Sequence, residues 1–411
     1  MPITTHMQQV KKTAFFVARL IIALAGIGFI IWSTTWTDHV IVPSGVRLPN
    51  GNILDKATAY PITTGNGQAF EANQPVTIVI ERGTSPVSMD IPVEPRGQEP
   101  DNFQFKPGIV KSLREANLAW VLLGLVLLGP IYPIQGYRWG LLLRARGLHV
   151  SFGKSFRLVM VGSFFNYCMP GSTGGDVVKA YYAAKGSGRN ADAIMSVLFD
   201  RIAGLLGLII LGSVAGLFML GDPIARQVTI SIWLLAVILI AAGLVYFVPS
   251  LRRRFGVDWM VAKLPGHNLF ASIDQAAVAY RNHKNTATLA VGISILVHML
   301  LITSVASAGY SLGIGHGFGM MAAVLPILFV VTALPISYQG LGIVEGLGLH
   351  LLVQAPLCTA NQLIGMFLLF RVYMVVYGLL GSLFLLGGDI HMHPQDATDT
   401  AQNSPVAAVT T

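Results

Sequence analysis

The residues best suited to bind a charged ligand are the few ionisable side chains within the apolar part of this sequence. Three acids and three bases lie in or beside long apolar runs: Asp176, Asp200, Glu345, Lys179, Arg201 and Arg371. A charge at the centre of a lipid bilayer costs at least ~2.5–3.5 kcal/mol on insertion scales. Such side chains must therefore pair, reach the membrane surface or line a wet cavity. Arginine can also bind a phosphate through two parallel hydrogen bonds.

Position in the sequence suggests roles for four of these residues. Asp176 and Lys179 are three residues apart, so they share one face if 177–182 is helical. Either they pair only with each other at the cytoplasmic surface, or they face a ligand. Asp200 and Arg201 stand near the start of another apolar run, where they either anchor that helix at the surface or line the same interior.

Arg371 is the deepest of the bases. It is the ninth residue of the apolar run that starts at Leu363. A guanidinium at that depth requires a carboxylate or a cavity, because an unpaired charge in lipid is costly. Glu345 is the nearest deep acid in the sequence. We therefore expect Arg371 and Glu345 to face a common interior.

Two stretches around these acids are alike. Each of 166–176 and 334–345 contains a proline, a short polar stretch, two glycines and an acid, and an arginine follows each at some distance. Glycines let backbone N–H groups approach an anion, and half-helix N-termini favour negative charge. The predicted substrate-binding residues are Asn166, Pro170, Gly174, Gly175, Asp176, Lys179, Asp200, Arg201, Pro335, Gly340, Gly342, Glu345 and Arg371. Together they suit a phosphate-bearing head group.

The composition places these residues in a membrane protein. Of 411 residues, 53% are hydrophobic and 11% charged, against roughly 25% charged in an average soluble protein. The net charge of +8 then marks cytoplasmic loops and does not indicate a nucleic-acid partner. Cys168 and Cys358 are far apart and form no CxxC, so neither a disulfide framework nor a metal site is indicated. We expect no cofactor.

Apolar runs predict simple spans at 13–32, 118–132, 197–220, 230–248, 289–312 and 363–386. Basic residues cluster on one side of these spans. Arg138, Arg144 and Arg146, for example, are interpreted as part of a cytoplasmic loop after the second span. This bias predicts a multi-pass protein of the cytoplasmic membrane with both termini in the cytoplasm. Residues 1–36 form the first transmembrane helix, and 116–387 form the main transmembrane domain.

The apolar stretches 156–182 and 320–353 do not fit simple spans. Basic residues flank both ends of the first, and none flanks the second. The first is broken at 170–175, and the second at Pro326, Pro335, Gly340 and Gly342. Broken backbone inside a membrane is tolerated only within protein or beside a cavity. We interpret them as two re-entrant helical hairpins that enter from opposite sides, which makes an inverted repeat. The alternative is two ordinary helices with proline kinks.

The two hydrophilic segments flank this domain. Residues 37–115 hold 7 Lys or Arg and 9 Asp or Glu, and 76–80 and 87–93 predict a β-hairpin. We expect a small β-rich extracytoplasmic insert, either passive or binding a protein partner. Residues 388–411 contain no Lys or Arg and predict a disordered cytoplasmic tail. The fold class is thus an all-α polytopic membrane protein with a β-rich insert.

Three motifs, in 166–179, 196–205 and 334–345, resemble the flippase-like transmembrane region of lysylphosphatidylglycerol synthases. The resemblance covers about 116–387. It implies a polytopic membrane protein that moves an anionic or modified lipid between leaflets. In full-length synthases a cytosolic aminoacyl-transferase domain follows. Here the chain stops in a short polar tail, so synthase activity is not implied, and the insert 37–115 departs from the usual pattern.

The function we expect is translocation, without catalysis, of an anionic or modified phospholipid or a lipid-linked glycan. Two alternatives remain open. The chain could be a scaffold that recruits a partner through the insert, which deletion of 37–115 would test. It could also be an enzyme acting on a polyprenyl-phosphate lipid. That activity would require clustered acids at the outer face, and Asp38, Asp55 and Asp222 do not cluster in the sequence.

Overall fold

The computed structural model describes residues 28, 31 and 34–47 except 43, short stretches between 53 and 106, and 108–386 with gaps at 169–173, 186–188, 258, 260–282, 334–337 and 355–356. The predicted first helix lies almost wholly outside the described residues. The predicted tail 388–411, Pro170 and Pro335 also lie outside them.

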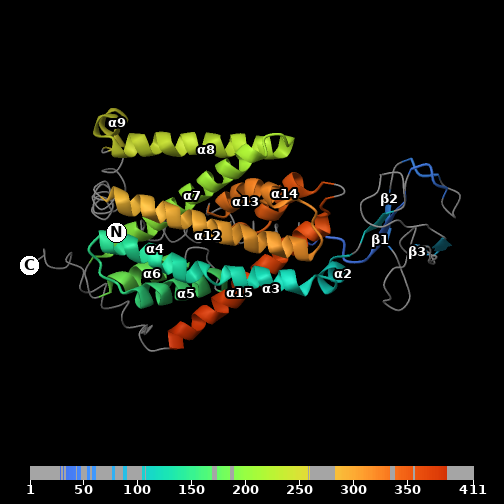
Figure 1. Cartoon of the computed structure of the whole chain (residues 1–411), viewed down its shortest axis with the longest axis horizontal. Coiled ribbons are helices and arrows are strands. Elements are labelled where there is room, and N and C mark those ends of the chain that lie inside the picture. The colour runs from blue at the N-terminus through green and yellow to red at the C-terminus, as the bar shows by residue number, and fades with distance from the viewer. Residues whose placement is uncertain are drawn as a thin grey trace, which may run out of the picture.

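Five helices among the described residues are long and apolar enough to cross a membrane. The first is formed by α3 (Leu118–Leu128) and α4 (Ile131–Ala145) in succession, and the others are α7 (Asn190–Phe218), α8 (Pro223–Phe247), α12 (Lys284–Ser311) and α15 (Ala360–Leu386). Each covers all or almost all of one predicted run, so the polytopic helical class is confirmed. Most of them lie along the long axis of the molecule (Figure 1).

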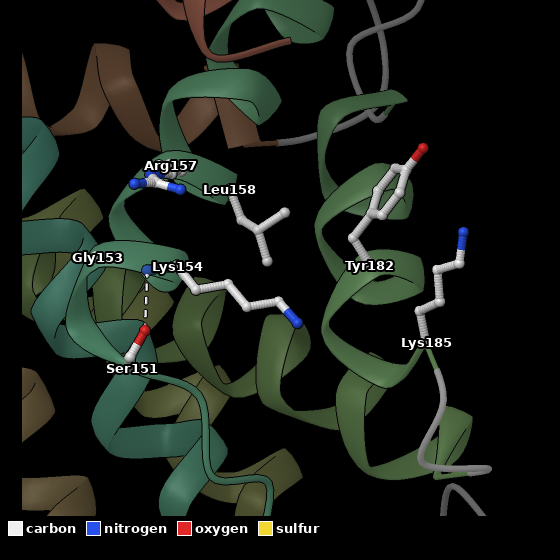
Figure 2. Close-up of a pocket in the computed structure, with 7 residues that line it drawn as sticks. All are labelled: Ser151, Gly153, Lys154, Arg157, Leu158, Tyr182 and Lys185. Carbon is white, nitrogen blue, oxygen red and sulfur yellow. Dashed lines mark hydrogen bonds between the residues drawn. The ribbon is translucent and has the colours of Figure 1, made fainter. Parts of the chain in front are cut away.

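Shorter helices pack among these spans. The two predicted broken stretches form α5 (Phe152–Cys168) with α6 (Gly174–Ala184), and α13 (Phe318–Ala333) with η3 (Tyr338–Gly340) and α14 (Ile343–Leu352). At 11 and 10 residues, α6 and α14 are shorter than the ~20 residues that a span needs. Figure 1 places α13 and α14 nearer the end that carries the strands, and α5 and α6 nearer the end that carries α9 (Pro249–Arg254). A pocket of about 440 Å³ lies at α5 and α6 (Figure 2).

Two sequence interpretations were wrong in detail. Pro326 does not break its stretch, because α13 continues through it to Ala333. Its ring packs where Gly212 of α7 leaves room for it, and such packing lets helices in membranes accommodate proline. Arg138 and Arg144 are not in a loop. They lie in α4, which continues to Ala145, and the loop begins only after that residue.

The segment between the first two predicted spans contains the strands. Strands β3 (Val76–Ile78) and β4 (Val87–Met89) pair antiparallel, as predicted for this stretch. A second, three-stranded sheet has the order β2 (Thr58–Pro61), β1 (His39–Val42), β5 (Gln104–Lys106). Residues 109–114, which the sequence placed in the insert, instead form helix α2 (Ile109–Arg114), which packs against α15.

Close backbone contacts hold the short helices in place. Gly175 of α6 lies against the carbonyl of Gly162 in α5, and Gly381 of α15 lies against the carbonyl of Met160. A side chain at either glycine would collide with backbone. Trp139 of α4 is fully buried beside α5 and α7. The α5–α6 pair is therefore clamped between α4, α7 and α15.

Candidate functional site

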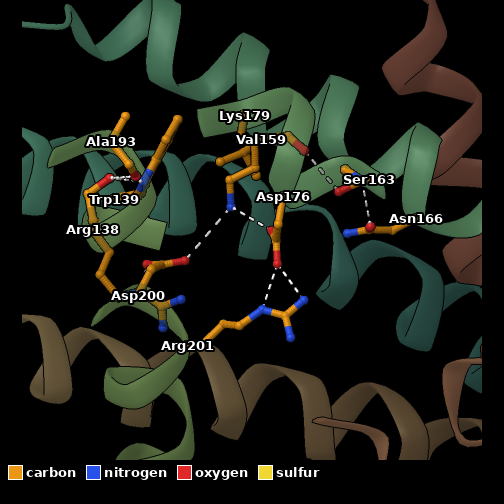
Figure 3. Close-up of polar contacts among 12 residues, drawn as sticks. Arg138, Trp139, Val159, Ser163, Asn166, Asp176, Lys179, Ala193, Asp200 and Arg201 are labelled. Atoms are coloured by element: carbon orange, nitrogen blue, oxygen red, sulfur yellow. Dashed lines mark hydrogen bonds and ion pairs between the residues drawn. The ribbon is translucent and has the colours of Figure 1, made fainter. Parts of the chain in front are cut away.

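Among the described residues, the largest group of paired charges joins α4, α6 and α7, and most of its members are buried. We call Arg138, Asp176, Lys179, Asp200 and Arg201 the α6–α7 cluster. Figure 3 shows these side chains converging from three helices. Arg138 Nε donates to Asp200 Oδ1 over 2.8 Å, and its Nη1 donates to Ser294 Oγ of α12 over 2.6 Å. Arg138 is only 5% exposed, so this contact is the deepest of the cluster.

Lys179 connects the two acids of the cluster. Its Nζ lies 3.4 Å from Asp176 Oδ1 and 3.9 Å from Asp200 Oδ2. The same ammonium lies 4.9 Å from the centre of the Trp139 ring, where the negative face of the ring attracts a cation. Trp139 is fixed in turn, because its Nε1 donates to Ser196 Oγ over 3.1 Å. Lys179 is thus placed by two acids and an aromatic face.

Arg201 occupies the accessible side of the cluster. Its Nε and Nη2 both contact Asp176 Oδ2, at 2.6 and 2.5 Å. The Arg201 side chain is 42% exposed, whereas that of Asp176 is 17% exposed. The guanidinium therefore covers the acid and keeps donor groups available on its outer side. The cluster has three cations and two acids, so it carries one excess positive charge.

A second ion pair joins α14 and α15. Arg371 contacts Glu345 Oε1 through Nε at 3.1 Å and through Nη2 at 2.5 Å. The other oxygen of Glu345 accepts the backbone N–H of Gly342 over 2.8 Å, which caps the start of α14. The Glu345 side chain is 2% exposed and that of Arg371 is 26% exposed. The predicted pairing of these two residues is confirmed, and we call them the α14–α15 pair.

The two ion-pair sites are built on the same plan. Asp176 and Glu345 each lie in the first turn of a short helix. Each pairs with an arginine on the long helix that follows, 25 residues later for Asp176 and 26 for Glu345. Acids in a first turn are favoured by the helix dipole. The two broken segments therefore resemble each other in their acid–arginine contacts as well as in their composition.

One hydrogen bond links the two broken segments directly. Gln339 Nε2 donates to the carbonyl oxygen of Asn166 over 2.9 Å. Asn166 is near the end of α5, and its Oδ1 accepts the N–H of Gly175 over 3.0 Å. Gln339 has φ of 52° and is the only non-glycine with positive φ among the described residues. Such backbone strain concentrates at functional sites.

The predicted glycines differ in what surrounds them. Gly174 has open space where a side chain would point. The N–H groups of Gly175 and Gly342 are already bonded to Asn166 and Glu345, so they hold the protein together instead of facing a ligand. Gly340 has φ of +69° and sits against Val344. That conformation strongly favours glycine.

Sequence reasoning overlooked Arg138 and Gln339. Arg138 was assigned to a basic loop, although apolar residues continue on both sides of it and could have indicated a buried position. Its partner Asp200 is 62 residues away. Gln339 lies within the motif at 334–345, but nothing in that motif indicates its contact with Asn166. Among the described residues, no three His, Cys, Asp or Glu side chains gather where they could hold a metal ion.

Comparison with known families gives a match over most of the chain. The family model of the lysylphosphatidylglycerol synthase TM region matches residues 107–381. The match begins just before α2 and ends within α15, so it includes both ion-pair sites and leaves out the strands. A search of curated proteins gave no match.

Proposed function

Because this chain belongs to the family of the lysylphosphatidylglycerol synthase TM region, we propose that it moves a phosphate-bearing lipid head group between the leaflets of the membrane. The family is a membrane domain associated with lipid handling. The observation that carries the proposal is the repeated acid–arginine pair on two broken segments that touch through Gln339 and Asn166. Repeated sites between broken helices are a common design of transporters.

The arginines suit a phosphate ligand. Arg201 and Arg371 are both more exposed than the acids that hold them. A guanidinium can bind a carboxylate with one edge and a phosphate with another, because its five N–H donors lie in one plane. We propose that the acids fix the orientation of the arginines, and that the head group binds to their accessible donors.

We propose that α5–α6 and α13–α14 are re-entrant hairpins of an inverted repeat. The support is their short second helices, their placement toward opposite ends of the molecule in Figure 1 and the similar spacing of acid and arginine. A head group leaving one ion-pair site would then meet the other at a different depth. Movement of one hairpin relative to its partner would open the site to one leaflet at a time.

We propose that the end of the molecule carrying α9 faces the cytoplasm. Arg252, Arg253 and Arg254 lie in α9, and short loops rich in Arg and Lys stay on the cytoplasmic side. The strands at the other end would then be extracytoplasmic. In a chain without its native cysteines, a label at Gly256 should be reached only from the cytoplasm and one at Ser44 only from outside. Labelling of Ser44 from the cytoplasm would reverse this orientation.

Translocation can be measured in proteoliposomes that contain phosphatidylglycerol with a fluorescent acyl chain. Dithionite added outside bleaches only lipid that reaches the outer leaflet. We expect wild-type protein to expose inner-leaflet label. Arg371→Ala and Arg201→Ala should each lower the rate about tenfold or more, because a hydrogen bond to a charged group is worth about 1.5–3 kcal/mol.

Arg226→Ala is the matched control for these substitutions. Arg226 is an exposed arginine in the first turn of α8, outside both ion-pair sites. This variant should translocate at the wild-type rate. Wild-type protein that leaves the inner leaflet unbleached with every lipid tested would contradict the proposed function.

A further inference from the structure

A histidine on α12 lies beside the α6–α7 cluster without belonging to it. His298 is in the middle of α12, one turn after Ser294, whose Oγ accepts a hydrogen bond from Arg138. His298 Nε2 lies 2.9 Å from the carbonyl oxygen of Gly204 in α7. His298 Nε2 and Arg138 Nη1 each lie within 4.0 Å of the position that a Cβ would take at Gly204. The imidazole and the guanidinium are therefore neighbours at this glycine.

The contact with Gly204 decides which ring nitrogen of His298 is basic. A carbonyl oxygen only accepts, so Nε2 must carry the hydrogen of the neutral imidazole and donate it. Nδ1 then has a free lone pair. That atom is buried and has no hydrogen-bond partner among the described residues. A buried polar atom without a partner is uncommon and requires an explanation, such as a functional role.

The groups around His298 determine what this lone pair can accept. Of the helices packed against α12, α3 and α13 contain no titratable side chain. Helix α4 presents Arg138, and α7 presents Asp200 and Arg201, about one turn before Gly204. The ionisable side chains of α15 contact other partners, namely Glu345 for Arg371, Gly124 for Tyr373 and Leu125 for Tyr377.

The charge balance at this place is positive. On α12 itself, the other ionisable residues, Lys284 and Tyr310, are at its two ends. His298 is therefore closest to the α6–α7 cluster, which already carries one excess positive charge. A proton on Nδ1 would add a second positive charge. Such a proton is disfavoured until an anion binds nearby, because like charges repel inside a protein more strongly than in water.

We propose that His298 is a proton-binding site coupled to head-group binding at the α6–α7 cluster, so that an anionic lipid and a proton bind together. The proposal rests on the proposed function for the identity of the anion. The phosphate that binds Arg201 brings a negative charge, and Nδ1 takes a proton from water and becomes a cation that attracts it. By linkage, each ligand then raises the affinity for the other by the same factor. Ionisable side chains between membrane helices mark ion and proton pathways in transporters.

Calorimetry of the full chain in phosphatidylcholine nanodiscs can test this coupling without any variant. The probe is dihexanoyl phosphatidylglycerol, titrated at about pH 6.5, where histidine usually ionises, in two buffers that differ in ionisation enthalpy. A proton taken from the buffer adds that enthalpy to the heat of binding, so the difference between the buffers measures proton uptake. We expect net uptake when wild-type protein binds this lipid. We expect none with dihexanoyl phosphatidylcholine, whose head group has no net charge.

The variant H298Q assigns the proton to this side chain. The new amide keeps an N–H for the carbonyl of Gly204 but cannot titrate, so proton uptake should be largely lost while the thermal midpoint stays near that of wild type. Wild-type affinity for phosphatidylglycerol should rise on the order of tenfold as the pH falls from about 8 to about 5, because opposite charges about 10 Å apart at an effective dielectric constant of about 20 change each other's binding by about that factor. The affinity of H298Q should change less than about twofold.

The matched control is H149Q. His149 is an exposed histidine in the loop after α4, outside both ion-pair sites. This variant should keep the proton uptake and the pH dependence of wild type. A loss in H149Q equal to that in H298Q would show that the proton binds elsewhere and would overturn the site.

The remaining outcomes separate this inference from the proposed function. No proton uptake by wild-type protein, equal uptake in H298Q, or no binding of phosphatidylglycerol at any pH would overturn the coupling. If uptake depends on His298 but wild-type protein moves no lipid in proteoliposomes, the proposed function fails and the proton site stands. If wild-type protein moves lipid and H298Q takes up protons as wild type does, only the proton site fails.

Discussion

The α6–α7 cluster and the α14–α15 pair share a plan but differ in how their acids are held. Asp176 contacts both Arg201 and Lys179, and a second acid and Arg138 lie behind them. Glu345 has one basic partner and the N–H of Gly342. A phosphate that drew Arg201 away would leave Asp176 paired with Lys179. The same event at Arg371 would leave Glu345 without a cation.

This difference separates two roles that an arginine can have in a membrane. In the cluster, the buried Arg138 joins the helices, and under the proposed function the accessible Arg201 binds the ligand. In the α14–α15 pair, the same proposal gives both roles to Arg371. The same substitution should therefore affect stability and translocation together at Arg371, and separately at Arg138 and Arg201. The predictions below follow this order of expected effect on stability.

The largest loss is expected for Arg138→Ala. It leaves Asp200 buried with only Lys179 at 3.9 Å. Removing one partner of a buried ion pair typically lowers the free energy of unfolding by about 3–5 kcal/mol. Thermal unfolding in detergent should show a clear drop in the midpoint. Arg144→Ala, on the same helix but exposed, is the control and should unfold near the wild-type temperature. Equal midpoints for the two variants would place the stabilising contact elsewhere.

Arg371→Ala should have the next largest effect. The guanidinium of Arg371 is partly exposed and therefore partly hydrated. We expect its loss to lower the free energy of unfolding by about 2–3 kcal/mol, which is less than for a fully buried ion pair. The double variant R371A/E345Q removes the orphaned charge and keeps an oxygen that can accept the N–H of Gly342, so it should recover most of the lost stability in thermal unfolding. It should still fail to move lipid. A double variant that translocates at the wild-type rate would show that the pair is structural only.

A smaller effect distinguishes two neighbouring glycines of α6. Gly175→Ala would push a methyl group against the carbonyl of Gly162 and the Asn166 side chain, whereas Gly174→Ala meets nothing within 4 Å. A side chain too large for its site typically lowers the free energy of unfolding by about 1–3 kcal/mol. Gly174→Ala should be neutral or stabilising by up to ~1 kcal/mol, because alanine favours helix. Equal thermal midpoints for the two would mean that α5 and α6 are not held at this contact.

The sequence predicted the parts of this design that depend on local pattern. Long apolar runs defined the spans, and proline, glycine and acid marked both broken stretches. Depth alone predicted the pairing of Arg371 with Glu345, since the sequence offered that arginine no other deep acid. Arg138 was missed because a single arginine lowers the apolarity of a run, and its neutralising acid comes from a distant helix. Likewise, Pro326 remains in a helix because Gly212 of another helix makes room. Contacts between helices that are distant in the chain cannot be predicted from the local sequence.

The smallest change in stability is expected for Arg201→Ala. This variant tests the comparison between the α6–α7 cluster and the α14–α15 pair most directly. Arg201 is the most exposed base of the cluster, and exposed ion pairs contribute about 0–1 kcal/mol. Asp176 would keep Lys179 at 3.4 Å, so no acid is orphaned. The thermal midpoint should therefore stay near that of wild type while lipid translocation falls. Arg201→Lys keeps the charge without the planar fork of donors, so it should restore translocation only in part. An Arg201→Ala protein that unfolds early, as Arg371→Ala should, would remove the distinction between the two sites.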